Sequence, residues 1–470
     1  MTSHAFRFPA SPALSVLVLS LALMGCSTLR SPYEPPAVAV PAQWQHGSTT
    51  LTASPARDAQ AATGGWWKAF NDPALDGLVG AVLARNNDLA AAAIQVRRAQ
   101  LQARLSENRP TLNASTNASV GKPLEGGSTT RSSGASLGVS YELDLWNRLG
   151  ASLDAARWEA QATAEDREAT AQSLVGTTAT LYWQLGYYSQ RLRSAAESIA
   201  YAERTLALVQ AQYDAGAVSS LELAESRKSV ASQRATRTQQ EQQYVETSNA
   251  LALLLGSTAL DSSVPGWSPP QALPATPLPE VAEGLPAEML ASRPDLRAAE
   301  LRLRGTLATV DATRLSYYPQ FSLTGALGTS SSSLGNLLAN PIATLGAGLV
   351  LPFLNQTEMQ VNTEIARADY EKAVINFRQT MYQAFTDVDN ALSARAQYAE
   401  QATHLEQSLA DAQRAERLYE LRYRAGSVAL KPWLDAQESR RSAETALAEN
   451  RLNRLINHAT LYKALGGAML

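Results

Sequence analysis

Four short stretches of alternating apolar and small polar residues interrupt a chain whose pattern is otherwise that of long helices. They occur as two pairs, at about 111–121 with 135–145 and at about 319–329 with 343–353. Alternation of period two over roughly ten residues, with one apolar and one polar face, is typical of membrane β-barrel strands around a wet lumen. Four strands cannot close a barrel, because about eight is the practical minimum. If these strands span a membrane, several copies of the chain must build the barrel together.

The beginning of the chain is typical of an exported lipoprotein. Arg7 precedes an apolar run over 13–24, which is too short for a spanning helix and suits a signal peptide over 1–25. Leu-Met-Gly then precedes Cys26, the only cysteine, and this resembles the lipobox of bacterial lipoproteins. We therefore expect a covalent lipid on Cys26, no other cofactor, and a Pro-rich tether over 26–65.

Charge and motif content limit the function classes. The net charge is −3, so the chain lacks the strong positive charge that would predict nucleic-acid binding. No apolar run approaches the ~20 residues of a membrane-spanning helix, so a spanning part would consist of strands. The four histidines lack partners at metal-ligand spacing, and no nucleophile or phosphate-binding motif occurs. We expect neither a metal site nor an enzyme.

Helical periodicity organises most of the remaining chain. A helix is expected over about 74–108, with Asp72 as its N-cap. Apolar residues at steps of three and four then predict one long helix over about 147–213. A break at Gly216 separates it from a returning helix over about 219–255. Such long helices have to lie against partners along their length.

The same ordered landmarks recur about 210 residues later in the chain, which predicts an internal duplication. The clearest pair is YDAGAVSSL at 213–221 and YRAGSVALK at 423–431. Each half reads as helix, strand hairpin, long helix, tight turn and returning helix. The expected domains are a first repeat at 66–260, a Pro-rich linker at 261–284 and a second repeat at 285–470.

In their order, these motifs resemble the outer membrane efflux family, the TolC-like channels, in its lipidated branch that serves RND-type pumps. The resemblance rests on WWKAFNDPALDGLV at 66–79, NNDLAAAAIQVRRAQ at 86–100, RLSYYPQFSLTGALG at 314–328 and the paired YxAGxV turns. It implies a mainly α fold with a β membrane portion. Three chains would assemble as a homotrimer, and each would give four strands to a twelve-stranded β-barrel and its long helices to a periplasmic α-helical barrel.

The resemblance also implies a function. The chain would be a lipid-anchored outer-membrane channel that passively passes small molecules such as drugs from an RND-type inner-membrane pump and a periplasmic membrane-fusion adaptor to the exterior. Ser27 after the cysteine favours transport to the outer membrane. Two alternatives remain. The channel of a type I protein-secretion system has the same architecture, and a periplasmic coiled-coil scaffold lipoprotein would explain the helices and anchor but not the strand pairs.

By motif match, the family's periplasmic gate falls at the turns of the two helical hairpins. The matching residues are Glu222 and Asp435 as pore-facing acids, and Tyr213, Tyr423 and Arg424 as links between the hairpins. A ring of carboxylates repels itself and favours cations, so closure needs such links. Val428 and Pro432 stand where some relatives have a base and an acid, so closure here would depend more on Tyr423, Arg424 and packing. Alternatively, both acids are solvated residues that stabilise helix N-termini.

Each hairpin turn contains one glycine, for which two interpretations stay open. The glycines let the chain reverse, because glycine tolerates positive φ. The resemblance also implies that helical hairpins of the adaptor dock at the turns, where small residues permit close approach. The expected docking positions are Gly216, Val218, Gly426 and Val428.

Overall fold

The computed structural model describes residues 29–47, 65–260, 264, 267–281, 292–332 and 341–467. The chain forms two compact units. The first, here called the strand unit, comprises 1–38, 95–164 and 298–378, and the second, the hairpin unit, comprises 39–94, 165–297 and 379–470. The predicted signal peptide, Cys26 and part of the predicted linker lie outside the described residues.

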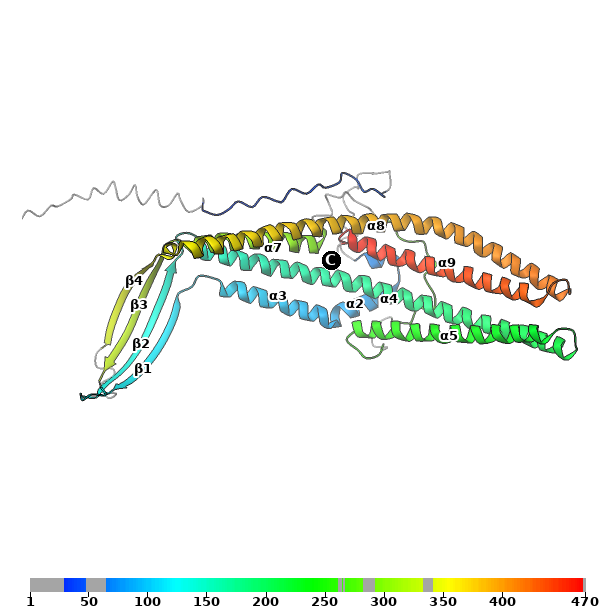
Figure 1. Ribbon diagram of the computed structural model, residues 1–470, viewed down its shortest axis with the longest axis horizontal. Helices are drawn as coiled ribbons and strands as arrows, with labels where there is room; N and C mark the ends of the chain where they lie inside the picture. The colour runs from blue at the N-terminus through cyan, green and yellow to red at the C-terminus, as the bar shows by residue number, and fades with distance from the viewer. Residues whose placement is uncertain are drawn as a thin grey trace, which may run out of the picture. The chain divides into compact units, whose positions relative to one another are not determined.

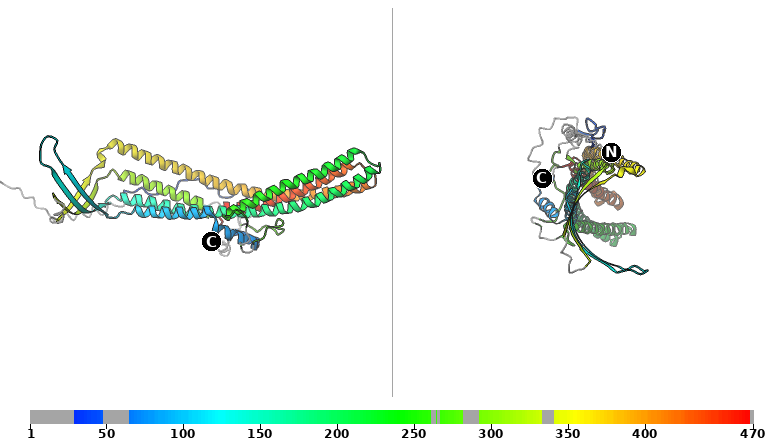
Figure 2. Two further views of the ribbon diagram at one scale, coloured as in Figure 1. Left: turned by 90° about the horizontal axis from the view of Figure 1, so that it is seen from below. Right: turned by 90° about the vertical axis from the view of Figure 1, so that its left-hand side faces the viewer.

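The strand unit contains one antiparallel sheet in the order β1-β2-β3-β4 (Figure 1). Its strands are β1 Thr111–Gly121, β2 Thr130–Leu143, β3 Gln320–Ser331 and β4 Pro341–Val350. The β2–β3 pairing joins the two halves of the sequence, and the sheet is curved (Figure 2). The register places small polar residues opposite each other on one face, as where Asn113 meets Gly138 and Ser115 meets Ser136. One face is therefore polar across strands, as the alternation predicts.

Two strand ends differ from expectation for local reasons. β2 begins at Thr130 rather than about 135, although 130–134 carry little apolar character. These residues continue the hydrogen-bonded ladder as far as Gly121, the end of β1. β4 ends at Val350 rather than about 353, because Pro352 lacks the backbone N–H that a ladder requires and begins a short 3₁₀ helix.

Long helices make up most of the described chain. They are α4 Arg148–Asp214, α5 Ser220–Leu254, α7 Pro294–Leu315, α8 Gln356–Arg424 and α9 Leu430–Ala464. The predicted long helix and its returning partner are thus observed as α4 and α5, which run together to their turn, as α8 and α9 do (Figures 1 and 2). Among the described residues, no helix has both the length and the apolar character needed to cross a bilayer.

The helix predicted over about 74–108 is wrong as a single element, because it is broken at Asn86. The chain forms α2 Pro73–Arg85 and α3 Asn87–Leu105, with Asn86 in an extended conformation between them. The Asn86 side chain accepts a hydrogen bond from the Leu89 N–H at 3.0 Å and donates to the Leu254 carbonyl at 3.0 Å. It therefore caps α3 and ties this break to α5. The N-cap prediction for Asp72 is confirmed, since its carboxylate accepts from two backbone N–H groups of α2.

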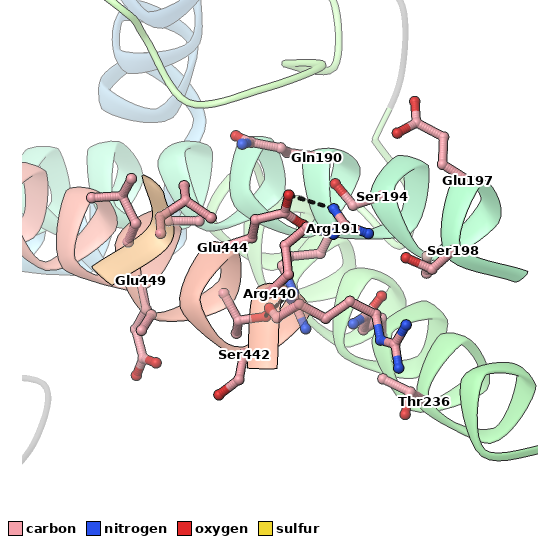
Figure 3. Close-up of a pocket in the computed structure, with 18 of the residues that line it drawn as sticks. Gln190, Arg191, Ser194, Glu197, Ser198, Thr236, Arg440, Ser442, Glu444 and Glu449 are labelled. Atoms are coloured by element: carbon pink, nitrogen blue, oxygen red, sulfur yellow. Dashed lines mark hydrogen bonds and ion pairs between the residues drawn. The ribbon is translucent and has the colours of Figure 1, made fainter. Parts of the chain in front are cut away.

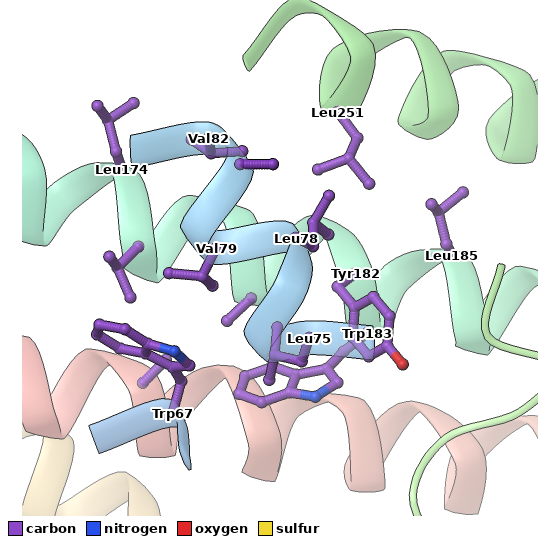
Figure 4. Close-up of a cluster of buried hydrophobic side chains, with 14 of the residues drawn as sticks. Trp67, Leu75, Leu78, Val79, Val82, Leu174, Tyr182, Trp183, Leu185 and Leu251 are labelled. Atoms are coloured by element: carbon purple, nitrogen blue, oxygen red, sulfur yellow. The ribbon is translucent and has the colours of Figure 1, made fainter. Parts of the chain in front are cut away.

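A hydrophobic core in the hairpin unit holds the ends of its helices that lie far from the turns. Leu75, Leu78 and Val79 of α2 are 0% exposed and pack against α4, α5 and α9 (Figure 4). Trp66 stacks on Tyr462 of α9 with ring centroids 5.3 Å apart. Full burial of one such aliphatic side chain stabilises by about 1.5–3 kcal/mol. The core therefore anchors one end of both hairpins and leaves their turns to be held by other contacts.

Candidate functional site

The two hairpin turns have the same backbone geometry. Gly216 has φ 76° and its N–H donates to the Tyr213 carbonyl at 2.9 Å, while Gly426 has φ 69° and donates to the Tyr423 carbonyl at 2.9 Å. Among the described residues, no atom lies within 4 Å of a Cβ built on either glycine. Conformation rather than crowding within the chain therefore requires glycine here. Adaptor docking at these turns stays a prediction.

A small apolar group joins the tips of the two hairpins, and we call it the tip cluster. Its buried members are Val209 and Leu223 from the first hairpin and Tyr423, Leu430 and Trp433 from the second. Val218 and Val428, the expected docking residues, are partly buried against this cluster. At least part of their surface therefore serves contact between the hairpins.

Tyr423 provides a polar link across the tip cluster. Its hydroxyl donates to Oε1 of Gln212 on α4 at 2.6 Å, and this joins the second hairpin to the first. Burial raises the pKa of Tyr423, so the hydroxyl stays a donor at neutral pH. Tyr213, the corresponding residue of the first turn, is 41% exposed and does not belong to the cluster. The two halves are therefore not equivalent at the site.

Glu222 caps the helix that it begins. Its carboxylate accepts from the Ser219 N–H at 2.9 Å and also from the Ser219 hydroxyl, while the N–H of Leu221 donates to that hydroxyl at 3.2 Å. These hydrogen bonds hold the pKa of Glu222 below its usual range, so the group is charged. The structure therefore shows the helix-stabilising role, and Glu222 stays partly exposed.

The other two predicted gate residues form ion pairs within their own helices. Asp435 pairs with Lys431 at 2.8 Å, and both side chains are 63% exposed. Arg424 pairs with Glu420 at 2.7 Å, and a carboxylate oxygen of Glu420 accepts from the hydroxyl of Tyr201 on α4 at 3.3 Å. Arg424 thus approaches the first hairpin only through Glu420. Exposed pairs of this kind contribute little, about 0–1 kcal/mol.

Trp433 is the main contact residue that the sequence alone did not reveal. It is 2% exposed, lies 5.1 Å from the Tyr423 ring and meets the Tyr201 ring edge-on at 6.3 Å. Its position one turn into α9, next to Leu430 on the same helical face, was the available signal. The aromatic group therefore connects both hairpins at the turns.

Beyond the tips, a polar crevice of about 950 Å³ lies among α4, α5, α8 and α9 (Figure 3). Arg440 projects from α9 there and pairs with Glu416 at 2.5 Å and with Glu444 at 2.6 Å. Within the described ranges, no group of three His, Cys, Asp or Glu residues is arranged to hold a metal ion. The crevice among these four helices is therefore lined by polar and charged groups, whereas the tip cluster is apolar.

Comparison with known proteins identifies this architecture. The sequence model of the outer membrane efflux protein family matches the chain twice, at residues 78–257 and 285–467. The chain belongs to this family. Its members are outer-membrane channel proteins, so the chain is an outer-membrane efflux channel, and the predicted fold class and duplication are confirmed.

Individual relatives span nearly the whole chain. The pyoverdine export outer membrane protein OpmQ of Pseudomonas putida is 35% identical, over 97% of this chain and 97% of its own length. The probable outer membrane lipoprotein SilC of Salmonella typhimurium is 30% identical, over 95% and 96%. The crystal structure of the open state of the Neisseria gonorrhoeae MtrE outer membrane channel matches with a TM-score of 0.78 and 30% sequence identity. The match covers 93% of this chain and 98% of the MtrE chain. TolC-like architecture is thus shown along more than nine tenths of the chain.

Proposed function

We propose that this protein is the exit duct of a tripartite efflux system, and that it works as a homotrimer. It would receive small molecules from an RND-type pump of the inner membrane through a periplasmic adaptor, and would conduct them passively. The name of the relative OpmQ, a pyoverdine export protein, supports a small-molecule cargo. The relative SilC, named a lipoprotein, supports acylation of Cys26. Energy would come from the pump, and the chain would act as a channel rather than an enzyme.

The open sheet carries this proposal. Every residue of β1 and of β4 is exposed, including Leu112 at 74% and Leu345 at 91%. In the described sheet, β1 and β4 each pair on one side only. Unpaired backbone groups in hydrocarbon cost several kcal/mol each, so a spanning sheet has to close on itself. Pairing of β1 from one copy with β4 of the next would close it, and twelve strands from three copies exceed the practical minimum.

The tip cluster and the Tyr423–Gln212 hydrogen bond support a gate at the periplasmic turns. These contacts hold the two hairpins of one chain together, as closure requires. Tyr213, Glu222, Arg424 and Asp435 remain proposed gate residues. The charged groups of Glu222, Arg424 and Asp435 are partly or fully exposed, and each forms a hydrogen bond or ion pair with a residue at the end of its own helix. They are therefore available to face a pore or another copy. An adaptor that binds at Gly216, Val218, Gly426 and Val428 would loosen the cluster.

A cross-link between the hairpins tests the gate. Gln212→Cys and Tyr423→Cys are joined by a thiol-reactive cross-linker with a reducible bond in its spacer, which takes the place of the hydrogen-bonded pair, and purified channel is studied in planar bilayers. We expect low conductance while the cross-link is intact and higher conductance after its reduction, whereas the conductance of each single variant should not change on reduction. Equal conductance in both states would show that these tips do not gate the channel. An epitope tag at Gly126, between β1 and β2, should be labelled on intact cells, and a hidden tag would contradict the spanning sheet.

A further inference from the structure

Two buried side chains next to the tip cluster carry polar atoms that find no partner. Gln437 on α9 is 0% exposed, and Ser226 on α5 is 1% exposed. Within the described part of the chain, three atoms of these side chains lack a hydrogen-bond partner. They are the amide nitrogen and oxygen of Gln437 and the hydroxyl of Ser226. Buried polar groups are nearly always hydrogen-bonded, because burial without a partner is costly. These two residues therefore need a physical explanation.

The two residues lie at the same level of the hairpins. α5 and α9 both begin at a turn, and Leu223 of α5 and Trp433 of α9 meet in the tip cluster. Ser226 follows Leu223 by three residues and Gln437 follows Trp433 by four, so each lies one helical turn beyond the cluster on the same helical face. We call this pair the polar layer.

Some buried polar groups near the polar layer are satisfied, whereas others in the described part of the chain, among them Nε1 of Trp433 and Nη1 of Arg441, also lack a partner. The amide of Gln240 on α5, oriented to satisfy both its groups, donates to the Arg191 carbonyl at 3.1 Å and accepts from the Arg191 guanidinium at 2.9 Å. Arg440 pairs with two carboxylates. Buried polar residues among these helices can therefore have partners, whereas Gln437 lacks one at both of its amide atoms.

We propose that Gln437 and Ser226 keep the closed contact between the hairpins metastable. When the hairpins part, water reaches the three unsatisfied atoms and hydrates them, which offsets part of the loss of the tip cluster. An apolar pair in the same place would hold the tips shut more firmly. The polar layer thus sets how easily an adaptor can open the tips, and this inference rests on the proposed gate.

Thiol labelling of a buried neighbour measures this opening. Val230, one turn beyond Ser226 on α5, is 6% exposed, so a Val230→Cys thiol reacts with a maleimide only when the hairpins part. The assembled channel is extracted from membranes and labelled, and mass spectrometry follows the peptide that contains position 230. This separates its labelling from any labelling at Cys26. Adding Gln437→Leu should slow labelling about tenfold, because the closed state no longer contains an unsatisfied amide. Gln437→Met, which keeps the shape of the side chain, should slow it in the same direction if leucine disturbs assembly.

A matched control variant should not show the slower labelling expected of Gln437→Leu. Gln240→Leu makes the same chemical change on α5 but removes an amide that is satisfied by Arg191 of the same hairpin, so labelling at position 230 should not slow. Unchanged or faster labelling in both Gln437 variants would overturn the inference. If the cross-link between positions 212 and 423 fails to close the channel, the gate itself is wrong. If that cross-link closes the channel while Gln437→Leu does not slow labelling, only the polar layer is wrong.

Discussion

Replacing Trp433 by alanine is expected to open the closed tips. The indole is 2% exposed and contacts the rings of Tyr201 and Tyr423, so its loss removes the largest side chain of the tip cluster. Truncation of a buried tryptophan costs about 3–5 kcal/mol. Tyr201 belongs to the first hairpin and Tyr423 to the second, so about half of this, ~2 kcal/mol, should come from contact between hairpins. Since 1.4 kcal/mol is tenfold, the open population should rise about thirtyfold.

Single-channel recording in planar bilayers measures this change as open probability. Trp146→Phe is the matched control, because Trp146 donates from Nε1 to the Pro319 carbonyl at 2.7 Å within the strand unit and lies outside the tip cluster. It should leave the open probability unchanged. Tyr423→Phe removes one hydrogen bond and should raise the open probability only about fivefold. A fully assembled Trp433→Ala channel with the open probability of the native protein would refute the role of the cluster.

Three further predictions concern stability and backbone geometry. Burial lowers the pKa of His458 from 6.5 to about 4 in the folded protein. Above pH 6.5 the imidazole is therefore neutral in both the folded and the unfolded protein. Only the unfolded state gains a proton between pH 6.5 and 4, so stability should fall by about 3 kcal/mol over that window in thermal unfolding, and His458→Gln should lack this slope. Asp72→Ala removes the N-cap of α2 and the acceptor of the Tyr182 hydroxyl, and should cost about 1–3 kcal/mol in denaturant unfolding, whereas no loss would contradict the capping role. Gly426→Ala should cost about 1–2 kcal/mol because of its positive φ, while helical Gly176→Ala should not destabilise; equal effects on melting temperature would disprove the geometric argument.

The sequence predicted the parts of the fold that depend on local periodicity. Alternation located the strands because each strand keeps one polar face, as the facing Ser115 and Ser136 show. Heptad spacing located α4 because its apolar residues recur along one face. The break at Asn86 was missed, although Asn-Asn-Asp is a capping signal, because the apolar pattern continues across it.

The site was harder to predict because it depends on which helical faces meet. Tyr423 was predicted as a link between hairpins, and the structure supplies its partner Gln212, which no motif marks. Trp433 and Gln437 required the relative register of α5 and α9, which the sequence does not contain. Glu222 matched a pore-acid position, yet its contacts within the chain are those of a helix cap.

Native mass spectrometry of the acylated protein extracted from outer membranes tests the central claim most directly. The account holds that β1 and β4 leave open edges that only further copies can close. It predicts one dominant species that contains three chains, each with the lipid on Cys26, and that the same preparation conducts ions. A monomer, or a ladder of species without a closed limit, would contradict the account.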